Sequence, residues 1–202
     1  VHGANRLGTN SLLDLLVFGR AAGNHIVEFN KTNVEHKALP ANAADATMAR
    51  IARLDNATTG EYAQDVANDI RSIMQQHAGV FRTQASMDEG VVKIAAMRDR
   101  VNAINLKDKS KIFNTARIEA LEVENLIEAA QATIVSAAAR RESRGAHSVD
   151  DYGDTAEHPN GRNDAEWHKH TLWHSATNAL TYKAVQMKPL TVESVALTVR
   201  SF

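Results

Sequence analysis

Apolar side chains recur every three or four residues over most of the chain, which is the spacing of amphipathic helices. This spacing predicts helices over residues 11–30, 43–55, 61–77, 86–104 and 113–141. In the last of them the apolar positions alternate steps of four and three, through Ala116, Ala120, Val123, Ile127, Ala130, Ile134 and Ala137. Such a seam is typical of a helix packed in a nearly antiparallel bundle. The pattern therefore predicts a mainly helical protein built around an antiparallel bundle.

The same periodicity predicts which side chains of the first four helices face inward. For the first helix, with Thr9 or Asn10 as its cap, these are Leu12, Leu13, Leu15, Leu16, Phe18, Ile26 and Phe29. For the next three they are Met48, Ile51 and Leu54, then Tyr62, Val66, Ile70 and Ile73 or Met74, then Met87, Val91, Ile94, Met97, Val101 and Ile104. Gly79 and the stretch FRTQ predict a turn between the third and fourth helices.

The pattern changes after Gly145. Residues 147–166 are rich in Asp, Asn, Gly and Glu, and are predicted to form a polar loop. The stretches KHTLWHS (169–175) and ALTYKAVQM (179–187) then favour two strands around a turn at 176–178. We expect one β-hairpin in a small α+β C-terminal region, and the tail 189–202 gives no assignment.

Composition limits the classes of function. With 44% hydrophobic residues the chain can bury a core, and with 23 basic and 24 acidic residues its formal charge of −1 gives no reason to expect nucleic acid as a partner. The absence of cysteine excludes disulfides, thiol catalysis and iron-sulfur ligation by this chain. No apolar run approaches the roughly 18 residues that span a bilayer, so we expect no direct membrane insertion. We interpret Val1 as an internal residue of a longer protein.

A group of histidines near the C-terminal end is the first candidate for metal chemistry. The group is His158, His168, His170 and His174, and on a strand the last three would share one face. Neither HExxH nor cysteine accompanies them, and no well-spaced carboxylate does. We predict no metal site and expect surface or interface histidines.

Glutamates on the last predicted helix resemble the paired carboxylates of metal-binding bundles. They are Glu119, Glu122, Glu124 and Glu128. The Glu-x-x-His pattern that such bundles carry on a second helix is missing, so we expect these side chains to face solvent.

The stretch RRESRGAH, residues 140–147, groups three arginines and a histidine where the last helix ends, with Gly145 as its stop. Two interpretations remain open. The cations could complement the negative end of the helix dipole, with glycine as terminator. Alternatively, the cluster could lock the helix against a neighbouring domain.

The first residues carry the clearest candidate site. Gly3 and Gly8 permit tight turns around Arg6, and a helix start near Ser11 presents backbone N–H groups and a positive dipole end. Arg6 offers a planar fork that suits a carboxylate. Together these groups could form an anion-binding corner, although a surface turn with one charge would give the same pattern.

Three strings resemble one family. HGANRLGTNSLLDLLVFGRAAG (2–23) resembles the segment near the end of the FAD-binding domain in succinate dehydrogenase flavoprotein subunits, a family shared with fumarate reductase and L-aspartate oxidase. RRESRGAHSVDDY (140–152) resembles the family's ESRGAH motif, and EWHKHTL (166–172) resembles its W-x-KHTL segment. The run SLLDLLVFG (11–19) is more similar to succinate dehydrogenase than to fumarate reductase.

The resemblance implies a division into the end of an FAD-binding domain (1–30), a helical bundle (31–145) and a small C-terminal domain (146–202). It implies that the full subunit oxidises succinate to fumarate, passes a hydride to FAD and sends electrons to an iron-sulfur subunit and quinone. Arg6 matches the arginine that binds a substrate carboxylate, and Ser11 and Leu12 match positions that contact FAD. The implied partners are the iron-sulfur and membrane anchor subunits, which would place a bacterial protein at the cytoplasmic side of the inner membrane.

Other parts of the family's chemistry are missing from these residues. The chain lacks the GxGxxG dinucleotide fingerprint, and the family's FAD-linking histidine and proton-transferring arginine lie upstream of the matched region. We therefore expect the 202 residues alone to be inactive, without tightly held FAD, and to self-associate or to have a disordered N-terminus because the first helix lacks its partner. A fumarate reductase or L-aspartate oxidase fragment, or a free-standing helical interaction module, remain alternatives.

Overall fold

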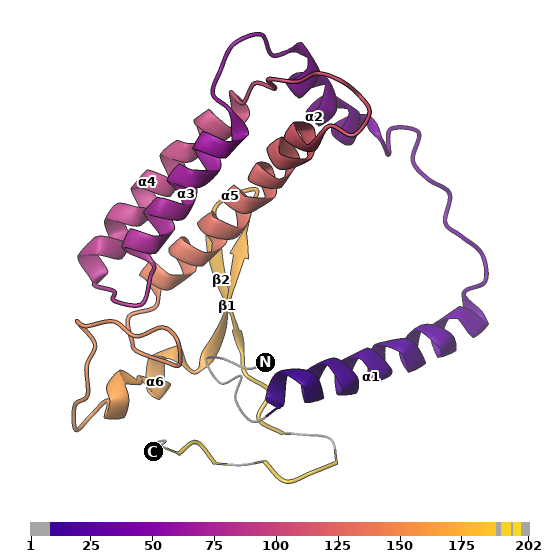
Figure 1. Ribbon diagram of the computed structural model, residues 1–202. Helices are drawn as coiled ribbons and strands as arrows, with labels where there is room; N and C mark the ends of the chain where they lie inside the picture. The colour runs from indigo at the N-terminus through magenta and orange to yellow at the C-terminus, as the bar shows by residue number, and fades with distance from the viewer. Residues whose placement is uncertain (1–8, 189–190, 195, 199–202) are drawn as a thin grey trace. The chain divides into compact units, whose positions relative to one another are not determined.

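The computed structural model describes residues 9–188, 191–194 and 196–198. The elements in these residues are α1 (Asn10–Thr32), α2 (Asp45–Asn56), α3 (Ala63–His77), α4 (Gln84–Asn102), α5 (Thr115–Ala139), the 3₁₀ turn η1 (Pro159–Gly161), α6 (Asp164–Trp167), β1 (Lys169–His174) and β2 (Ala179–Ala184) (Figure 1). The five predicted helices and the hairpin are confirmed, and both ends of each predicted helix lie within two residues of the prediction, whereas α6 was not predicted. The chain divides into two compact units, residues 1–50 and 51–202.

The first unit contains α1, which begins after Thr9 in the left-handed conformation (φ 69°). Thr9 occupies the cap position as predicted, but its side chain makes no capping hydrogen bond. The apolar residues predicted to face inward are all more than half exposed: Leu12, Leu13, Leu15, Leu16, Phe18, Ile26 and Phe29. The prediction that Met48 points inward is also wrong, since it is 60% exposed. Periodicity marks an apolar face, but it does not say whether the chain itself supplies the cover.

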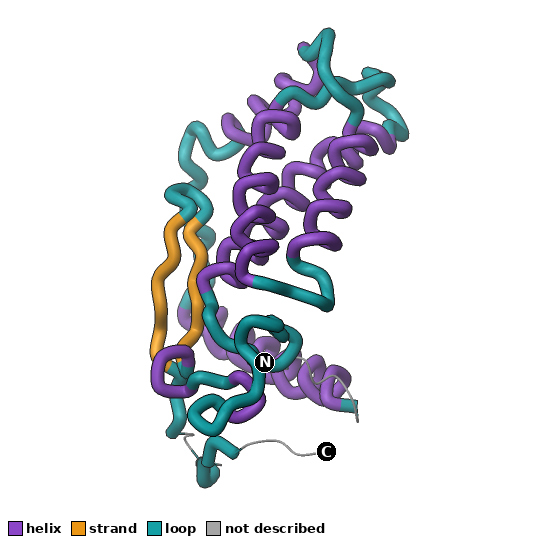
Figure 2. Tube along the Cα trace, turned by 90° about the vertical axis from the view of Figure 1, so that its left-hand side faces the viewer, coloured by secondary structure: helices purple, strands orange, loops and turns teal. Residues whose placement is uncertain are grey.

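The core of the second unit lies among α3, α4 and α5, which run side by side (Figure 2). The seam predicted for α5 is confirmed by five buried residues: Ala120, Val123, Ile127, Ala130 and Ile134. In the last turn Ala138 is buried in place of Ala137, and Ala116 is half-buried. Leu54 of α2 completes the core. Tyr62, predicted to be inward, is instead 46% exposed, and the Lys107 ammonium lies 6.0 Å from its ring centroid.

Two of the bundle helices begin with side-chain caps. The Thr83 hydroxyl accepts a hydrogen bond from the Ser86 amide (3.2 Å) at the start of α4. The Asn114 side chain accepts one from the Arg117 amide (2.9 Å) at the start of α5. Each satisfies a backbone donor that the helix itself leaves without a partner, which fixes where the helix begins.

The C-terminal part contains the predicted hairpin. Strands β1 and β2 pair antiparallel, from Lys169 opposite Ala184 to His174 opposite Ala179, and β1 packs against α5. At the turn Asn178 adopts φ 52°, and its side chain accepts a hydrogen bond from the Trp173 indole (2.8 Å). The stretch predicted as a polar loop also contains η1 and the start of α6. The fold is mainly helical, with a two-stranded antiparallel hairpin after the bundle.

Candidate functional site

The predicted anion-binding corner is described only at its helical end. Arg6 lies outside the described residues, whereas Ser11 and Leu12 occupy the first turn of α1. The first helical hydrogen bond runs from the Leu13 amide to the Thr9 carbonyl (3.0 Å). The amides of Ser11 and Leu12 therefore lie ahead of the first amide that donates within the helix. The first turn holds no acidic side chain. The first turn of α1 therefore carries the positive end of the helix dipole and contains no carboxylate, and Asp14 follows in the next turn.

The second and third motif strings meet in space through Arg140. Its guanidinium donates to the backbone carbonyls of Trp167 (2.9 Å) and Lys169 (2.7 Å), and to the Thr171 hydroxyl (3.2 Å). It also lies over the Trp167 ring, 5.3 Å from the centroid. A single residue after α5 therefore binds the backbone that leads into β1.

Glu142 lies at the centre of this contact, with only 1% of its surface exposed. Its carboxylate accepts hydrogen bonds from Arg140 (2.6 Å), from Arg144 (2.8 and 3.0 Å) and from the Asn163 amide (2.9 Å). Burial alone would raise the pKa of Glu142, but the bonds from Arg144, the Asn163 amide and Arg140 outweigh it and hold this pKa below its usual value. Arg144 also pairs with Asp164 (2.6 Å).

His147 links the same cluster to the turn between α3 and α4. Its Nε2 lies 2.9 Å from the Arg140 carbonyl and its Nδ1 lies 3.1 Å from Nη1 of Arg82. Because a guanidinium only donates, Nδ1 must accept and Nε2 must carry the proton, so the ring is neutral in this arrangement. Burial lowers the pKa of His147 below its usual value, and the charges of Arg82 and Arg140 act in the same direction.

These contacts decide between the two interpretations of residues 140–147. Helix α5 ends at Ala139 with no basic residue in its last turn, so dipole complementation does not describe the cluster. Gly145 is not the helix stop; it adopts φ 61° in a separate turn closed by Arg144 and His147. The cluster joins α5 to the C-terminal part of the chain. Arg82 and Asp164 were missed by the sequence analysis because no local pattern connects them with the motif.

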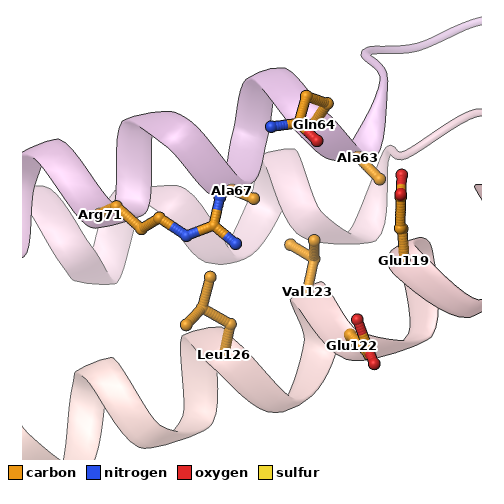
Figure 3. A pocket seen from close by; sticks show the side chains of 8 residues that line it. All are labelled: Ala63, Gln64, Ala67, Arg71, Glu119, Glu122, Val123 and Leu126. Carbon is orange, nitrogen blue, oxygen red and sulfur yellow. The ribbon is translucent and has the colours of Figure 1, made fainter.

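The glutamates of α5 divide into two kinds, which corrects the prediction that all four face solvent. Glu124 is bridged to Arg53 and Glu128 to Arg98, and both are only partly exposed. Glu119 and Glu122 are exposed and line a groove of about 360 Å³ between α3 and α5 (Figure 3). The other residues that line it are Ala63, Gln64, Ala67, Arg71, Val123 and Leu126. The floor is apolar and the rim is charged, and the groove brings together no nucleophile and base.

The histidines of the C-terminal part lie on and beside the hairpin. His168 precedes β1, His170 and His174 lie on it, and Nε2 of His174 lies 2.8 Å from the Thr181 hydroxyl. Across the described residues, no three His, Cys, Asp or Glu side chains are grouped as metal ligands. In the same part of the chain, no helix combines the length and apolar character that crossing a membrane requires.

Comparisons with known proteins agree on one family. The family model described as fumarate reductase flavoprotein C-term matches residues 67–202. The succinate dehydrogenase flavoprotein subunit of Coxiella burnetii is 44% identical over 189 residues, which cover 94% of this chain and 31% of that protein. The mitochondrial subunit of Oryza sativa subsp. japonica is 39% identical over 96% of this chain and 30% of its own length.

Solved structures give the same result. A quinol fumarate reductase structure from E. coli superposes with a TM-score of 0.77 at 32% identity, covering 96% of this chain and 33% of that one. The Mycobacterium smegmatis Sdh1 complex gives a TM-score of 0.75 at 25% identity, covering 94% and 32%. The chain spans about a third of the length of the curated relatives it matches. It belongs to the succinate dehydrogenase and fumarate reductase flavoprotein family, and corresponds to the C-terminal region of the subunit.

Proposed function

We propose that this chain is the C-terminal part of a flavoprotein subunit that oxidises succinate to fumarate and delivers the electrons to an iron-sulfur subunit and quinone. The observation that carries the proposal is the 44% identity to a succinate dehydrogenase flavoprotein subunit across 94% of the chain. The fumarate reductase flavoprotein subunit of Haemophilus influenzae is 36% identical over 85% of the chain, which favours the oxidative assignment.

Two observations at the start of α1 fit the electron-rich edge of a flavin. The amides of Ser11 and Leu12 precede the first helical hydrogen bond, and the first turn has no acidic side chain that would repel negative charge. Bound FAD would supply the hydride acceptor. Ser11 and Leu12 would hold it through this helix end, whose dipole stabilises negative charge on the reduced ring.

Arg6 would bind one carboxylate of the dicarboxylate substrate. A planar guanidinium matches a carboxylate in two parallel hydrogen bonds, which fixes the orientation as well as the position of the substrate. Its positive charge would also favour the electron-rich transition state. This assignment makes Arg6 the residue of this chain on which substrate oxidation depends most directly.

In the intact subunit, replacing Arg6 by alanine should lower kcat/KM for succinate by a factor of about 100 or more, because both orientation and charge are lost. Arg141→Ala is the matched control, since Arg141 is exposed and, among the residues that the structure describes, donates one long hydrogen bond to the Tyr152 hydroxyl (3.4 Å). The measurement is dye reduction with succinate as donor. Equal activity of the two variants would remove Arg6 from the substrate site.

The 202 residues alone should hold no stoichiometric flavin and turn over no succinate, because they supply only one corner of the proposed site. The absorbance spectrum of the purified chain and the same dye assay test this directly. A yellow protein with one flavin per chain, or measurable turnover, would contradict the assignment as a part of a larger subunit.

Fumarate reduction is the second candidate, favoured by the fold match to the E. coli quinol fumarate reductase structure. Measuring succinate oxidation and fumarate reduction by the intact complex with the same set of dyes distinguishes the two candidates by the ratio of the two rates. A free-standing helical module is disfavoured because Leu12, Leu15 and Leu16 of α1 are 60%, 67% and 72% exposed.

The partners that follow from this proposal are an iron-sulfur subunit and membrane anchor subunits. They would hold the flavoprotein at the membrane surface, on the cytoplasmic side of the inner membrane in a bacterium. Co-purification of the intact subunit with an iron-sulfur protein, and its release from membranes when the anchors are removed, would test the assembly.

A further inference from the structure

His147 lies where two turns of the second unit meet. The first turn, residues 79–84, connects α3 to α4, and the second, residues 147–152, follows the end of α5. The Asp150 amide donates to the Arg82 carbonyl (2.8 Å), and the Gln84 amide donates to the Asp151 carboxylate (2.5 Å). We call this pair of turns the joint.

The side chain of Arg82 is held on three sides in the joint. Its Nε donates to the Gly79 carbonyl (2.7 Å), and its Nη2 donates to the Ala78 carbonyl (2.9 Å) at the end of α3. Its Nη1 is directed at Nδ1 of His147 (3.1 Å). Because the first two bonds fix the guanidinium, the third requires an acceptor at one place, and only the neutral imidazole provides one there.

We propose that neutral His147 is the latch of this joint, and that protonation of its ring in mild acid opens the contact between the two turns. Protonation converts Nδ1 from acceptor to donor, so that two N–H groups face each other at 3.1 Å. The hydrogen bond from Nε2 to the Arg140 carbonyl survives the change. The ring therefore stays with α5 while the turn that carries Arg82 is released.

The charges around the ring do not compensate for the added proton. Arg82 faces it from the α3–α4 turn and Arg140 from the end of α5, and both are cationic. Glu142 is the acidic group that acts on the ring, but it already accepts bonds from Arg140, Arg144 and the Asn163 amide. Arg144, whose backbone pairs with that of His147, is a further cation. A protonated His147 would thus be a poorly compensated charge in a half-buried place.

The transition belongs to a defined pH range. A histidine has an ordinary pKa near 6.5, and burial together with the neighbouring arginines lowers that of His147. The joint is therefore closed above about pH 6.5, and its stability falls as the pH drops through the pKa of the folded form. The carboxylates of the cluster titrate in a lower range, which separates their effect from that of the latch.

The test is amide hydrogen exchange of the complete 202-residue chain between pH 7.5 and 5, corrected for intrinsic exchange rates. The protection of Asp150 and Gln84 should fall by a factor of about 10 or more, with the midpoint at which the His147 ring titrates by NMR. The Asn105 amide is the internal control, because it donates to the Glu61 carbonyl (2.9 Å) at the opposite end of α3 and α4 from the joint. Its protection should not follow the same midpoint.

Two variants sharpen the result. His147→Gln keeps a donor and an acceptor but cannot titrate, so the protection of Asp150 should no longer depend on pH in this range. Arg82→Gln removes one facing charge, so the pKa of His147 should rise toward its ordinary value. The proposal is overturned if His147 titrates while Asp150 and Gln84 stay protected, or if His147→Gln keeps the acid-induced loss. Even if a variant does not fold, the parent chain decides the question, because the pH midpoint of the His147 titration can be compared with the midpoint at which Asp150 and Gln84 lose protection. None of these readouts depends on the succinate reaction.

Discussion

Replacing Glu142 by glutamine should be among the most destabilising single-atom changes in this chain. The substitution keeps the shape of the side chain but removes its charge, at a site that is only 1% exposed. It leaves Arg140 and Arg144, whose side chains are 16% and 29% exposed, without their common counterion. Breaking one partner of a buried ion pair leaves charges that water cannot fully solvate.

The magnitude follows from the donors that the carboxylate receives. Four contacts of 2.6 to 3.0 Å come from Arg140, Arg144 and the Asn163 amide. Glutamine keeps one acceptor oxygen and turns an NH₂ group toward guanidinium donors, so about two charge-assisted bonds are lost. At about 1.5 to 3 kcal/mol each, the loss is roughly 3 to 6 kcal/mol, which overlaps the range of about 3 to 5 kcal/mol found when one member of a buried pair is removed. For a domain of this size that lowers Tm by about 10 °C.

The assay is urea unfolding followed by tryptophan fluorescence. The chain has two tryptophans, Trp167 in α6 and Trp173 in β1, so the signal reports on the region that Glu142 holds. Glu119→Gln is the matched control, because Glu119 is exposed on α5, and it should stay within about 0.5 kcal/mol of the parent. A Glu142→Gln loss below 1 kcal/mol would show that the cluster contributes little, and would refute the reasoning.

Three further outcomes are expected. Phe113 is 99% exposed and adopts φ 50°, a left-handed conformation that costs energy for any residue with a Cβ atom. Phe113→Gly should therefore raise the stability measured by urea unfolding by about 1 kcal/mol. Phe113→Ala keeps the strained conformation and should gain much less. The pKa values of Glu142 and Asp164 are lowered in the folded chain, so their contribution to folding stability is complete above their ordinary pKa values of 4.5 and 3.8 and is lost as the pH falls below those values. Acid unfolding of the parent chain and of Glu142→Gln measures this loss, and curves of stability against pH that run parallel for the two chains would contradict it. The chain should elute above monomer size in size-exclusion chromatography, because the apolar face of α1 is exposed. Leu16→Asp on that face should reduce the apparent size. A parent chain that is monomeric while α1 is helical would argue against self-association through this face.

The bundle could be predicted because its helices follow local rules. Apolar spacing identified five helices, and the alternation of four and three located the seam of α5. The one shift along that seam has a geometric reason. A straight helix drifts by about 20° for every seven residues, so after three such repeats the buried face has moved from Ala137 to Ala138.

The joint and the ion cluster could not be predicted because their partners lie far apart in the chain. Arg82 and His147 are 65 positions apart, and Arg144 and Asp164 are 20 apart. Charge patterns within one helix give no information at such separations. The same limit explains the error at Glu124, whose partner Arg53 comes from another helix, so that neither residue's local pattern marks the pair.

The strings that resemble the family have two different physical roles. The guanidinium of Arg140, in the second string, donates to acceptors within the chain, including the Trp167 and Lys169 carbonyls of the third string. A guanidinium held in this way could bind a ligand only by breaking those bonds and exposing the charge of Glu142. The second and third strings therefore act on the docking of the hairpin to α5, and their variants should change stability before they change chemistry. The proposed contacts with substrate and flavin are assigned instead to Arg6 and the first turn of α1.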